Sequence, residues 1–184
     1  MVNPEAQDLP LATARLLLEP LIPAHAPALH PLLLDARLYT YIPEDPPSSL
    51  EVLVARYRHL ASRHSPDGRE VWLNWAARLR AASDFVGTFQ ATVQPDRTAL
   101  LAYMIFTPYQ REGYAREGCD RVIEHLVHAY GVRQIVAEID TRNRASIALV
   151  ETLGFVRVAE RPAADFFKGA VSDEYRYEYR PEFP

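Results

Sequence analysis

Residues 108–118 read PYQREGYAREG and lie between an apolar run at 99–106 and a segment whose apolar residues have helical spacing. The chain has only 7 glycines, and two of them lie in this stretch. The unpaired N–H groups and partial positive charge of a helix start suit a diphosphate. Gly113 and Ala115 are small enough for close backbone approach, and Arg111 adds a cation. Small residues here also suit a close helix–strand contact, so this stretch alone leaves both interpretations open.

The rest of the sequence predicts a mixed α/β fold. Strands are expected at 16–21, 71–79, 85–93, 99–106, 134–139, 155–159 and 174–180, and helices at 24–34, 50–60, 112–130 and 143–153. Ser48 or Ser49 is expected to cap the second helix, and Pro31 to kink the first or delay its start. Antiparallel signals dominate the first half, whereas strands and helices alternate in the second. We find no linker, which indicates a single domain over residues 1–184.

Composition and charge narrow the function. The 184 residues are 48% hydrophobic and 24% charged, which is typical of a globular protein with a sizeable core. A net charge of −4 gives no support for nucleic-acid binding and weakly favours a cationic substrate such as an amine. The single cysteine, Cys119, excludes an intramolecular disulfide. No signal-peptide pattern or membrane-length apolar run is visible, so we expect a cytoplasmic protein.

Two segments resemble the acyl-coenzyme A binding motifs of the GNAT superfamily of N-acetyltransferases. QREGYA at 110–115 matches Q/R-x-x-G-x-G/A, and NRAS at 143–146, followed by LGF at 153–155, matches N-x-x-S/A leading to L-G-F. TARLLL at 13–18 resembles the T-x-R-L-x-L opening of the ribosomal-protein-alanine N-acetyltransferase-like branch. The motif-bearing part spans residues 11–160. The resemblance implies a single-domain GNAT fold: a mixed central sheet of about seven strands with a splayed strand pair, flanked by about four helices.

The resemblance also implies acetyl-coenzyme A (acetyl-CoA) as the acyl donor. The residues expected to contact it are Tyr103, Met104, Ile105, Gln110, Arg111, Glu112, Gly113, Tyr114, Ala115, Asn143 and Ser146. The first three would pair with the pantetheine arm through their backbone, residues 110–115 would hold the diphosphate, and the last two would lie near the pantetheine or the thioester. Structural roles would account for the same residues: residues 103–105 in a core strand, Asn143 as a helix N-cap and Ser146 as a small packing residue.

The implied reaction is direct transfer of the acetyl group to a primary amine in a ternary complex. Many members of the superfamily carry a tyrosine general acid within L-Y-E-x-x-G-F, and Val150 stands in its place here. Water or Ser146 is then expected to protonate the leaving thiolate. Glu138 is the candidate general base, with a solvent-facing strand acid as the alternative. The histidines lack metal-ligand spacing, so no metal is expected.

The expected acceptor is a protein N-terminus, a polyamine-like amine or an aminoglycoside-like amine. In the GNAT fold its cleft is formed by the first two helices and the last strand pair, which correspond to 22–62 and 160–178. Phe166 and Phe167 are candidates for an aromatic wall or for covering the sheet edge, and Trp72 is a further candidate for the lining. No nucleic-acid or membrane partner is expected, and a homodimer is compatible with the sequence. The alternative functions are a catalytically weak acyl-CoA-binding regulatory module and transfer of a larger group such as succinyl.

Overall fold

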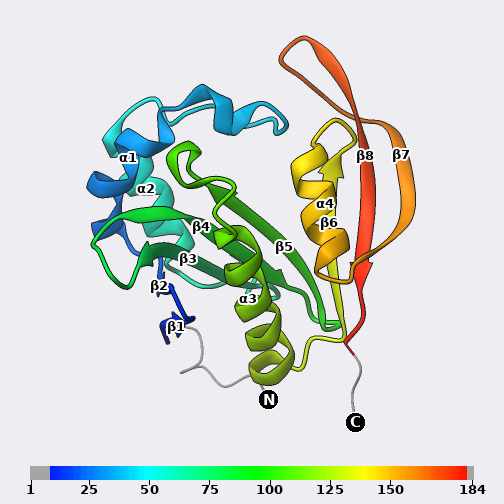
Figure 1. The fold of residues 1–184 in the computed structure, drawn as a ribbon, viewed down its shortest axis with the longest axis horizontal. Coiled ribbons are helices and arrows are strands. Elements are labelled where there is room, and N and C mark those ends of the chain that lie inside the picture. Colours follow the sequence, from blue (N-terminus) through cyan, green and yellow to red (C-terminus); the bar gives the residue numbers. More distant parts are fainter. Residues whose placement is uncertain (1–8, 182–184) are drawn as a thin grey trace.

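The computed structural model describes residues 9–181, which contain one eight-stranded mixed sheet and four α-helices (Figure 1). The strands are β1 (Leu11–Ala12), β2 (Leu16–Pro20), β3 (Val71–Leu79), β4 (Phe85–Val93), β5 (Thr98–Ile105), β6 (Gln134–Asp140), β7 (Val156–Phe167) and β8 (Ala170–Tyr179). The helices are α1 (Ala26–Leu33), α2 (Leu50–Leu60), α3 (Tyr114–Tyr130) and α4 (Arg144–Thr152), with short 3-10 turns η2 (Pro23–His25), η3 (Ala36–Tyr39) and η4 (Thr107–Tyr109). The strand order is β1-β2-β3-β4-β5-β6-β8-β7.

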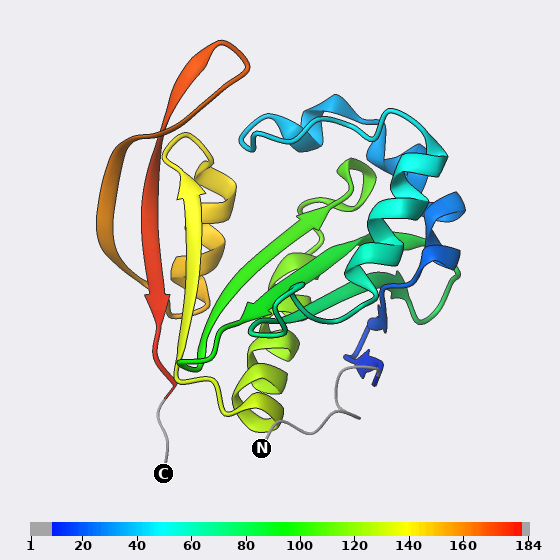
Figure 2. The ribbon, with the colours of Figure 1, turned by 180° about the vertical axis from the view of Figure 1, so that it is seen from behind.

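The strands β5 and β6 form the one parallel pair of this sheet within residues 9–181, and they separate early. Their register covers only three residue pairs, from Thr98 with Gln134 to Leu100 with Val136. Beyond that point β5 continues to Ile105 while β6 continues on a diverging course (Figures 1 and 2). The expected mixed sheet with a splayed strand pair is therefore confirmed, with eight strands where about seven were expected.

The helices cover both faces of the sheet and create two cores. Figures 1 and 2 show α3 and α4 on one face, and α1 and α2 on the other. Trp75 and Phe89 are buried in the core beneath α3, whereas Leu29, Leu53 and Phe106 belong to the core beneath α1 and α2. The C-terminal end of β5 thus lies between the two cores, because Ile105 packs in the first and Phe106, the next residue, packs in the second.

The structure differs from the sequence prediction most in the last hairpin. Strand β7 was expected to end at 159 and β8 to begin at 174, but they run to Phe167 and from Ala170. Almost every residue of β7 is exposed, and the β7–β8 register shifts twice, so the strand lacks the apolar alternation on which the prediction depends. Lys168 and Gly169, at φ 52° and 76°, form the two-residue turn that joins the strands.

The first helix also begins later than expected. Residues 23–25 form the 3-10 turn η2, and α1 starts at Ala26. Pro31 lies inside α1, where its ring removes one main-chain hydrogen bond. Leu29 and Leu33 are buried on either side of this proline, and their packing stabilises the short helix around it.

Candidate active site

The outer edge of β5 presents main-chain groups to the gap left by β6. The N–H of Phe106 donates to the carbonyl of Val86 on β4 at 2.9 Å. Bonded and non-bonded positions alternate along an antiparallel ladder, so Met104, two residues earlier, also directs its main-chain groups to β4. Those of Tyr103 and Ile105 point the other way, into the gap. Among the three strand residues expected to pair with a pantetheine arm, these two are suitably oriented and Met104 is not.

Two neighbouring contacts agree with this geometry. A Cβ atom at Gly87 of β4 would collide with the carbonyl oxygen of Met104, which places that carbonyl against β4. The Gln110 side chain donates from Nε2 to the carbonyl of Ile105 at 3.0 Å. The Gln110 side chain therefore occupies the carbonyl of Ile105, the last residue of β5. Its amide group is bonded there and does not point toward the start of α3.

The turn before α3 is built to leave helix N–H groups open. Arg111 and Gly113 have positive φ angles of 69° and 81°, and Gly113 is the N-cap residue. Gly113 has no side chain to accept a hydrogen bond, and the first helical bond runs from the Glu117 N–H to its carbonyl at 3.1 Å. The N–H groups of Tyr114 and Ala115 consequently lack helical partners, as in other anion-binding helix starts.

The β1–β2 turn braces this loop. Thr13 Oγ1 and the Arg15 main-chain N–H donate to Glu117 Oε1 at 2.5 and 2.7 Å, and Arg15 Nε donates to Glu117 Oε2 at 2.7 Å. Arg15 Nη1 also donates to the carbonyl of Glu112 at 2.9 Å. Burial acts to raise the pKa of Glu117, but these donors outweigh it and hold the pKa below its usual value. Thr13 and Arg15 of the T-x-R motif thus neutralise the one acid in the first turn of α3.

The second glycine of the opening stretch has a packing role that the sequence did not reveal. Gly118 lies on the buried face of α3, directly against the ring of Phe89 on β4. A Cβ atom there would lie 2.5 and 2.7 Å from Phe89 Cε1 and Cε2. Gly118 therefore lets α3 lie close to the sheet. Its only sequence signal is a glycine at a core-facing helical position.

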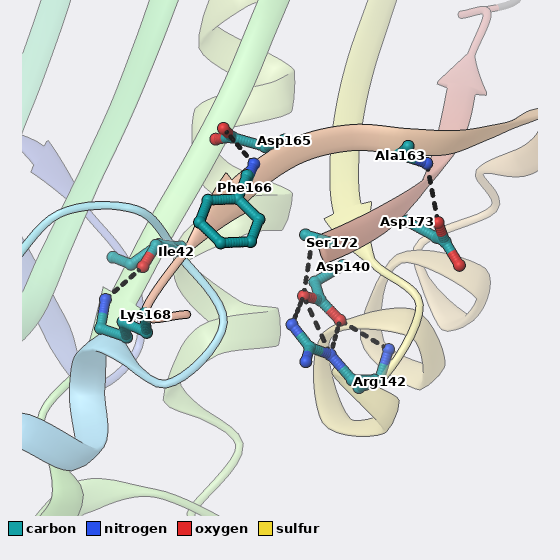
Figure 3. A network of polar contacts seen from close by, with 9 residues as sticks. All are labelled: Ile42, Asp140, Arg142, Ala163, Asp165, Phe166, Lys168, Ser172 and Asp173. Carbon is teal, nitrogen blue, oxygen red and sulfur yellow. Dashed lines mark hydrogen bonds and ion pairs between the residues drawn. The ribbon is translucent and has the colours of Figure 1, made fainter. Parts of the chain in front are cut away.

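Two side chains fix the start of α4: the amide of Asn143 caps the helix, and the carboxylate of Asp140 holds the turn before it. Asn143 Oδ1 accepts a hydrogen bond from the Ser146 N–H at 3.1 Å, which is the expected N-cap. Just before it, the buried Asp140 carboxylate accepts from Arg142, with Nη2 at 2.5 Å, and from Ser172 Oγ at 2.8 Å (Figure 3). The hydrogen bonds from Arg142, opposed by burial, lower the pKa of Asp140 to about 2. The half-buried Ser146 is thereby held at the C-terminal end of β6, beside the gap.

Val150 is buried in the core under α4, so the tyrosine position of the family motif carries no hydroxyl. Tyr103 brings another hydroxyl to this region from β5. That hydroxyl is buried. Burial raises the pKa of Tyr103, and hydrogen bonding from the Ser146 side chain acts in the opposite direction. Cys119 is fully buried in α3, where it packs in the core.

Two carboxylates on the paired strands β6 and β8 differ in their partners. Glu138, the predicted base, accepts hydrogen bonds from Arg161 and Arg176 at 2.7 and 3.2 Å, so it is already engaged with two arginines. Glu174, in register with Asp140, makes no salt bridge within residues 9–181. Burial, followed by the nearby Glu138 carboxylate, raises the pKa of Glu174. Glu174 was not predicted as a site residue, because no local sequence pattern distinguishes it from the other charged residues of β8.

A cleft of about 430 Å³ lies on the α1–α2 side of β4 and β5. Its lining includes Tyr39, Arg56, Tyr57, Gln90 and Met104, with Glu44 and Asp45 at the loop before α2. The first of the two segments expected to form an acceptor cleft, 22–62, therefore does line one. Trp72 does not: it lines a separate hollow that includes residues 94–96, in the β4–β5 turn at the far end of the strands from the start of α3.

The tip of the β7–β8 hairpin reaches the loop that borders this cleft. Lys168 Nζ donates to the carbonyls of Ile42 and Glu44 at 2.7 and 2.9 Å, and Figure 3 shows the first contact. Phe166 is 67% exposed, and the Phe167 ring lies 5.2 Å from Lys168 Nζ. The hairpin therefore contacts the α1–α2 side mainly through its lysine.

Two features are absent from the part of the chain that the structure describes. No helix in it is long and apolar enough to span a membrane. No group of three or more His, Cys, Asp or Glu side chains in it is arranged to hold a metal ion.

The acetyltransferase (GNAT) domain model matches residues 15–156. The chain belongs to the GNAT family. This GNAT protein is 26% identical over 147 residues to the uncharacterized N-acetyltransferase YoaA of Bacillus subtilis (strain 168), covering 79% of this chain and 81% of YoaA.

Solved structures of the same fold include ribosomal-protein acetyltransferases, the branch expected from the sequence. RimL, a ribosomal L7/L12 α-N-protein acetyltransferase solved with coenzyme A (CoA), has a TM-score of 0.83 and 18% identity, with 94% of this chain and 98% of RimL covered. RimJ of Mycobacterium smegmatis, in complex with CoA-disulfide, has a TM-score of 0.83 and 17% identity, with 95% and 88% covered. The ribosomal-protein-S5-alanine acetyltransferase of Vibrio fischeri has a TM-score of 0.81 and 18% identity, with 94% and 97% covered. At this identity the likeness shows the fold.

Proposed function

We propose that this GNAT protein transfers an acetyl group from acetyl-CoA to a primary amine in a ternary complex. The observation that carries the proposal is the divergence of β5 from β6, followed directly by the Gly113 turn and the start of α3. The amides of a pantetheine arm pair with the open main-chain groups of Tyr103 and with the N–H of Ile105, as an added strand would. The diphosphate then lies at the unpaired N–H groups of α3.

The proposed acceptor is the N-terminus of a protein. Its ammonium group suits a cleft with the Glu44 carboxylate at its border, beside Asp45, which pairs with Lys168 at 3.7 Å. The names of RimL and of the Vibrio fischeri protein point to the same acceptor class, since each names a ribosomal protein as the group that is acetylated. Polyamines, aminoglycosides and larger acyl donors such as succinyl-CoA are the alternatives that the experiment below separates.

In the proposed reaction the protein positions two reactants and manages one proton. The amine must be neutral to attack the thioester carbonyl, and Glu174 takes its proton, directly or through water, because its raised pKa suits a base. The carbon–sulfur bond breaks with its electron pair moving to sulfur. Ser146, at the start of α4, donates a hydrogen bond to the departing sulfur. Holding both reactants in place supplies several kcal/mol of the barrier, on the order of 7 for well-oriented groups.

The test combines CoA binding with turnover. Calorimetry measures CoA affinity, and release of the CoA thiol from acetyl-CoA is followed with Ala- and Ser-initiated peptides, polyamines and aminoglycosides. Gly113→Ala should weaken CoA binding at least about tenfold, because the methyl group lies where the phosphates approach. Gly68→Ala is the matched control: Gly68 has a φ of 69° and no atom within 4 Å, and it lies in the turn after α2.

The outcomes separate the alternatives. Turnover with peptides, together with a binding defect confined to Gly113→Ala, supports the proposal. Tight CoA binding with no turnover of any acceptor, with acetyl-CoA or succinyl-CoA, would favour the acyl-CoA-binding regulatory module. Equal binding by both glycine variants would remove the α3 loop from the cofactor site.

A further inference from the structure

Tyr103 carries a buried hydroxyl group that the mechanism above does not use. The oxygen atom is shielded from solvent and has no hydrogen-bond partner in good geometry among residues 9–181. Buried polar groups in folded proteins nearly always have a partner, so an unpaired one requires an explanation. A phenylalanine would pack in the same space without leaving a hydroxyl unpaired.

The position of this hydroxyl is informative. Tyr103 lies on β5 beyond the last residue paired with β6, and its side chain packs against the core on the α3–α4 side. Burial raises the pKa of Tyr103, and hydrogen bonding from Ser146, in the first turn of α4, acts in the opposite direction, which places the Ser146 hydroxyl near that of Tyr103. The Tyr103 oxygen nevertheless has no hydrogen-bond partner within residues 9–181, so the two hydroxyl groups are near each other without being bonded. Asn143 Oδ1 accepts a hydrogen bond from the Ser146 N–H and does not engage the Ser146 hydroxyl, which can therefore bond to other groups.

We propose that Tyr103 is a positioning residue for acyl transfer: its hydroxyl donates a hydrogen bond to Ser146 Oγ, which turns the Ser146 proton toward the departing sulfur. The inference rests on the proposed acetyl transfer and on Ser146 acting at the sulfur. In this arrangement Tyr103, on β5, partly replaces the tyrosine that the L-Y-E-x-x-G-F motif would place at Val150. It acts through Ser146 and not directly on the sulfur.

The chemistry of this arrangement is balanced without proton loss from Tyr103. When the carbon–sulfur bond breaks, its electron pair stays on sulfur, and the thiolate receives hydrogen bonds rather than a proton from the protein. The proton released by the amine goes to Glu174. Burial raises the pKa of Tyr103, so the hydroxyl stays protonated and remains a donor throughout. A chain of two hydroxyl groups strengthens the terminal donor, because each hydrogen bond polarises the next.

Tyr103→Phe tests the proposal, since it removes one oxygen atom and keeps the ring. We expect kcat to fall about tenfold, with an unchanged KM for acetyl-CoA and an unfolding temperature equal to or above that of the wild type. In a Ser146→Ala background the same change should have no further effect on kcat. Tyr177→Phe is the control. Its hydroxyl is bonded to Glu151 on α4 at 2.9 Å, so this variant should lose stability and retain kcat.

A second readout does not require turnover. Hydrogen bonds to a thiolate lower the pKa of its thiol, so the thiol of enzyme-bound CoA, titrated by the ultraviolet absorbance of the thiolate, should have a higher pKa in Tyr103→Phe than in the wild type. If no amine is acetylated, the proposed function fails while this titration still decides the role of Tyr103. An unchanged thiol pKa, or a kcat loss that persists in the Ser146→Ala background, would overturn the inference.

Discussion

Substituting Gly118 by alanine tests whether α3 is placed by its contact with Phe89. The new Cβ atom would lie 2.5 and 2.7 Å from Phe89 Cε1 and Cε2, and closer still to Cζ. Carbon atoms in good contact are roughly 3.5 to 4 Å apart, so the ring or the helix must move by about 1 Å or more. The ring is fully buried in the core beneath α3, so it cannot move without displacing its neighbours.

The expected magnitude follows from two opposing effects. Overpacking a core costs about 1 to 3 kcal/mol, and the upper end applies because three atoms of a rigid ring are affected. Replacing glycine by alanine inside a helix gains about 1 kcal/mol. We expect a net loss of about 2 kcal/mol in the free energy of unfolding, which in a chain of this size lowers the unfolding temperature by roughly 4 to 8 °C.

A double-mutant cycle with Phe89→Leu isolates the contact. Leucine lacks the outer ring atoms, so Gly118→Ala should be neutral or stabilising in that background, with a coupling energy of about 2 kcal/mol. Chemical denaturation measures the stabilities, and calorimetry measures CoA affinity, which should weaken as α3 is displaced. Asp120→Ala, on the exposed face of α3, is the control. A wild-type-like or higher stability for Gly118→Ala alone would refute the reasoning.

Three further predictions follow from the site. Arg15→Gln should raise the Kd for CoA several-fold by leaving the Glu117 carboxylate beside the diphosphate loop, as calorimetry at low salt would detect; an unchanged Kd would contradict this. Asp140→Asn should cost about 2 kcal/mol at neutral pH. Because Arg142 lowers the pKa of Asp140 from 3.8 to about 2, the difference from wild type should persist above pH 4 and vanish as the pH falls toward 2; a pH-independent difference would argue against the ion pair. Glu174→Gln should lower kcat and remove the acidic limb of the pH–rate profile, which in the wild type should lie above the ordinary glutamate range; a retained limb would point to another base.

The parts of the site that depend on neighbouring residues could be predicted from the sequence. The Gly113 turn at the start of α3 and the Asn143 cap of α4 each depend on a few adjacent residues, and both are present. The splayed strands followed from the family resemblance. The T-x-R motif was noticed, but its partner Glu117 lies about a hundred residues away, so its bracing role required the structure.

What the sequence could not predict depends on register and on distant contacts. The extension of β7 was hidden because both of its faces are exposed. The direction of each peptide group on β5, which separates Met104 from Tyr103 and Ile105, depends on pairing with β4. The contrast between Glu138 and Glu174 arises from arginines on two other strands, and no local pattern reports it.

The contact between Lys168 and the loop at residues 42–44 has a consequence for the shape of an acceptor. The two segments are more than a hundred residues apart in the chain, and they meet beside the cleft on the α1–α2 side. This contact ties the hairpin to the border of the cleft, so the loop at residues 42–44 cannot move away from the cleft without losing both hydrogen bonds to Lys168. An acceptor that needs the loop to open would have to break them, whereas a slender chain end or amine that fits the cleft as it stands would not.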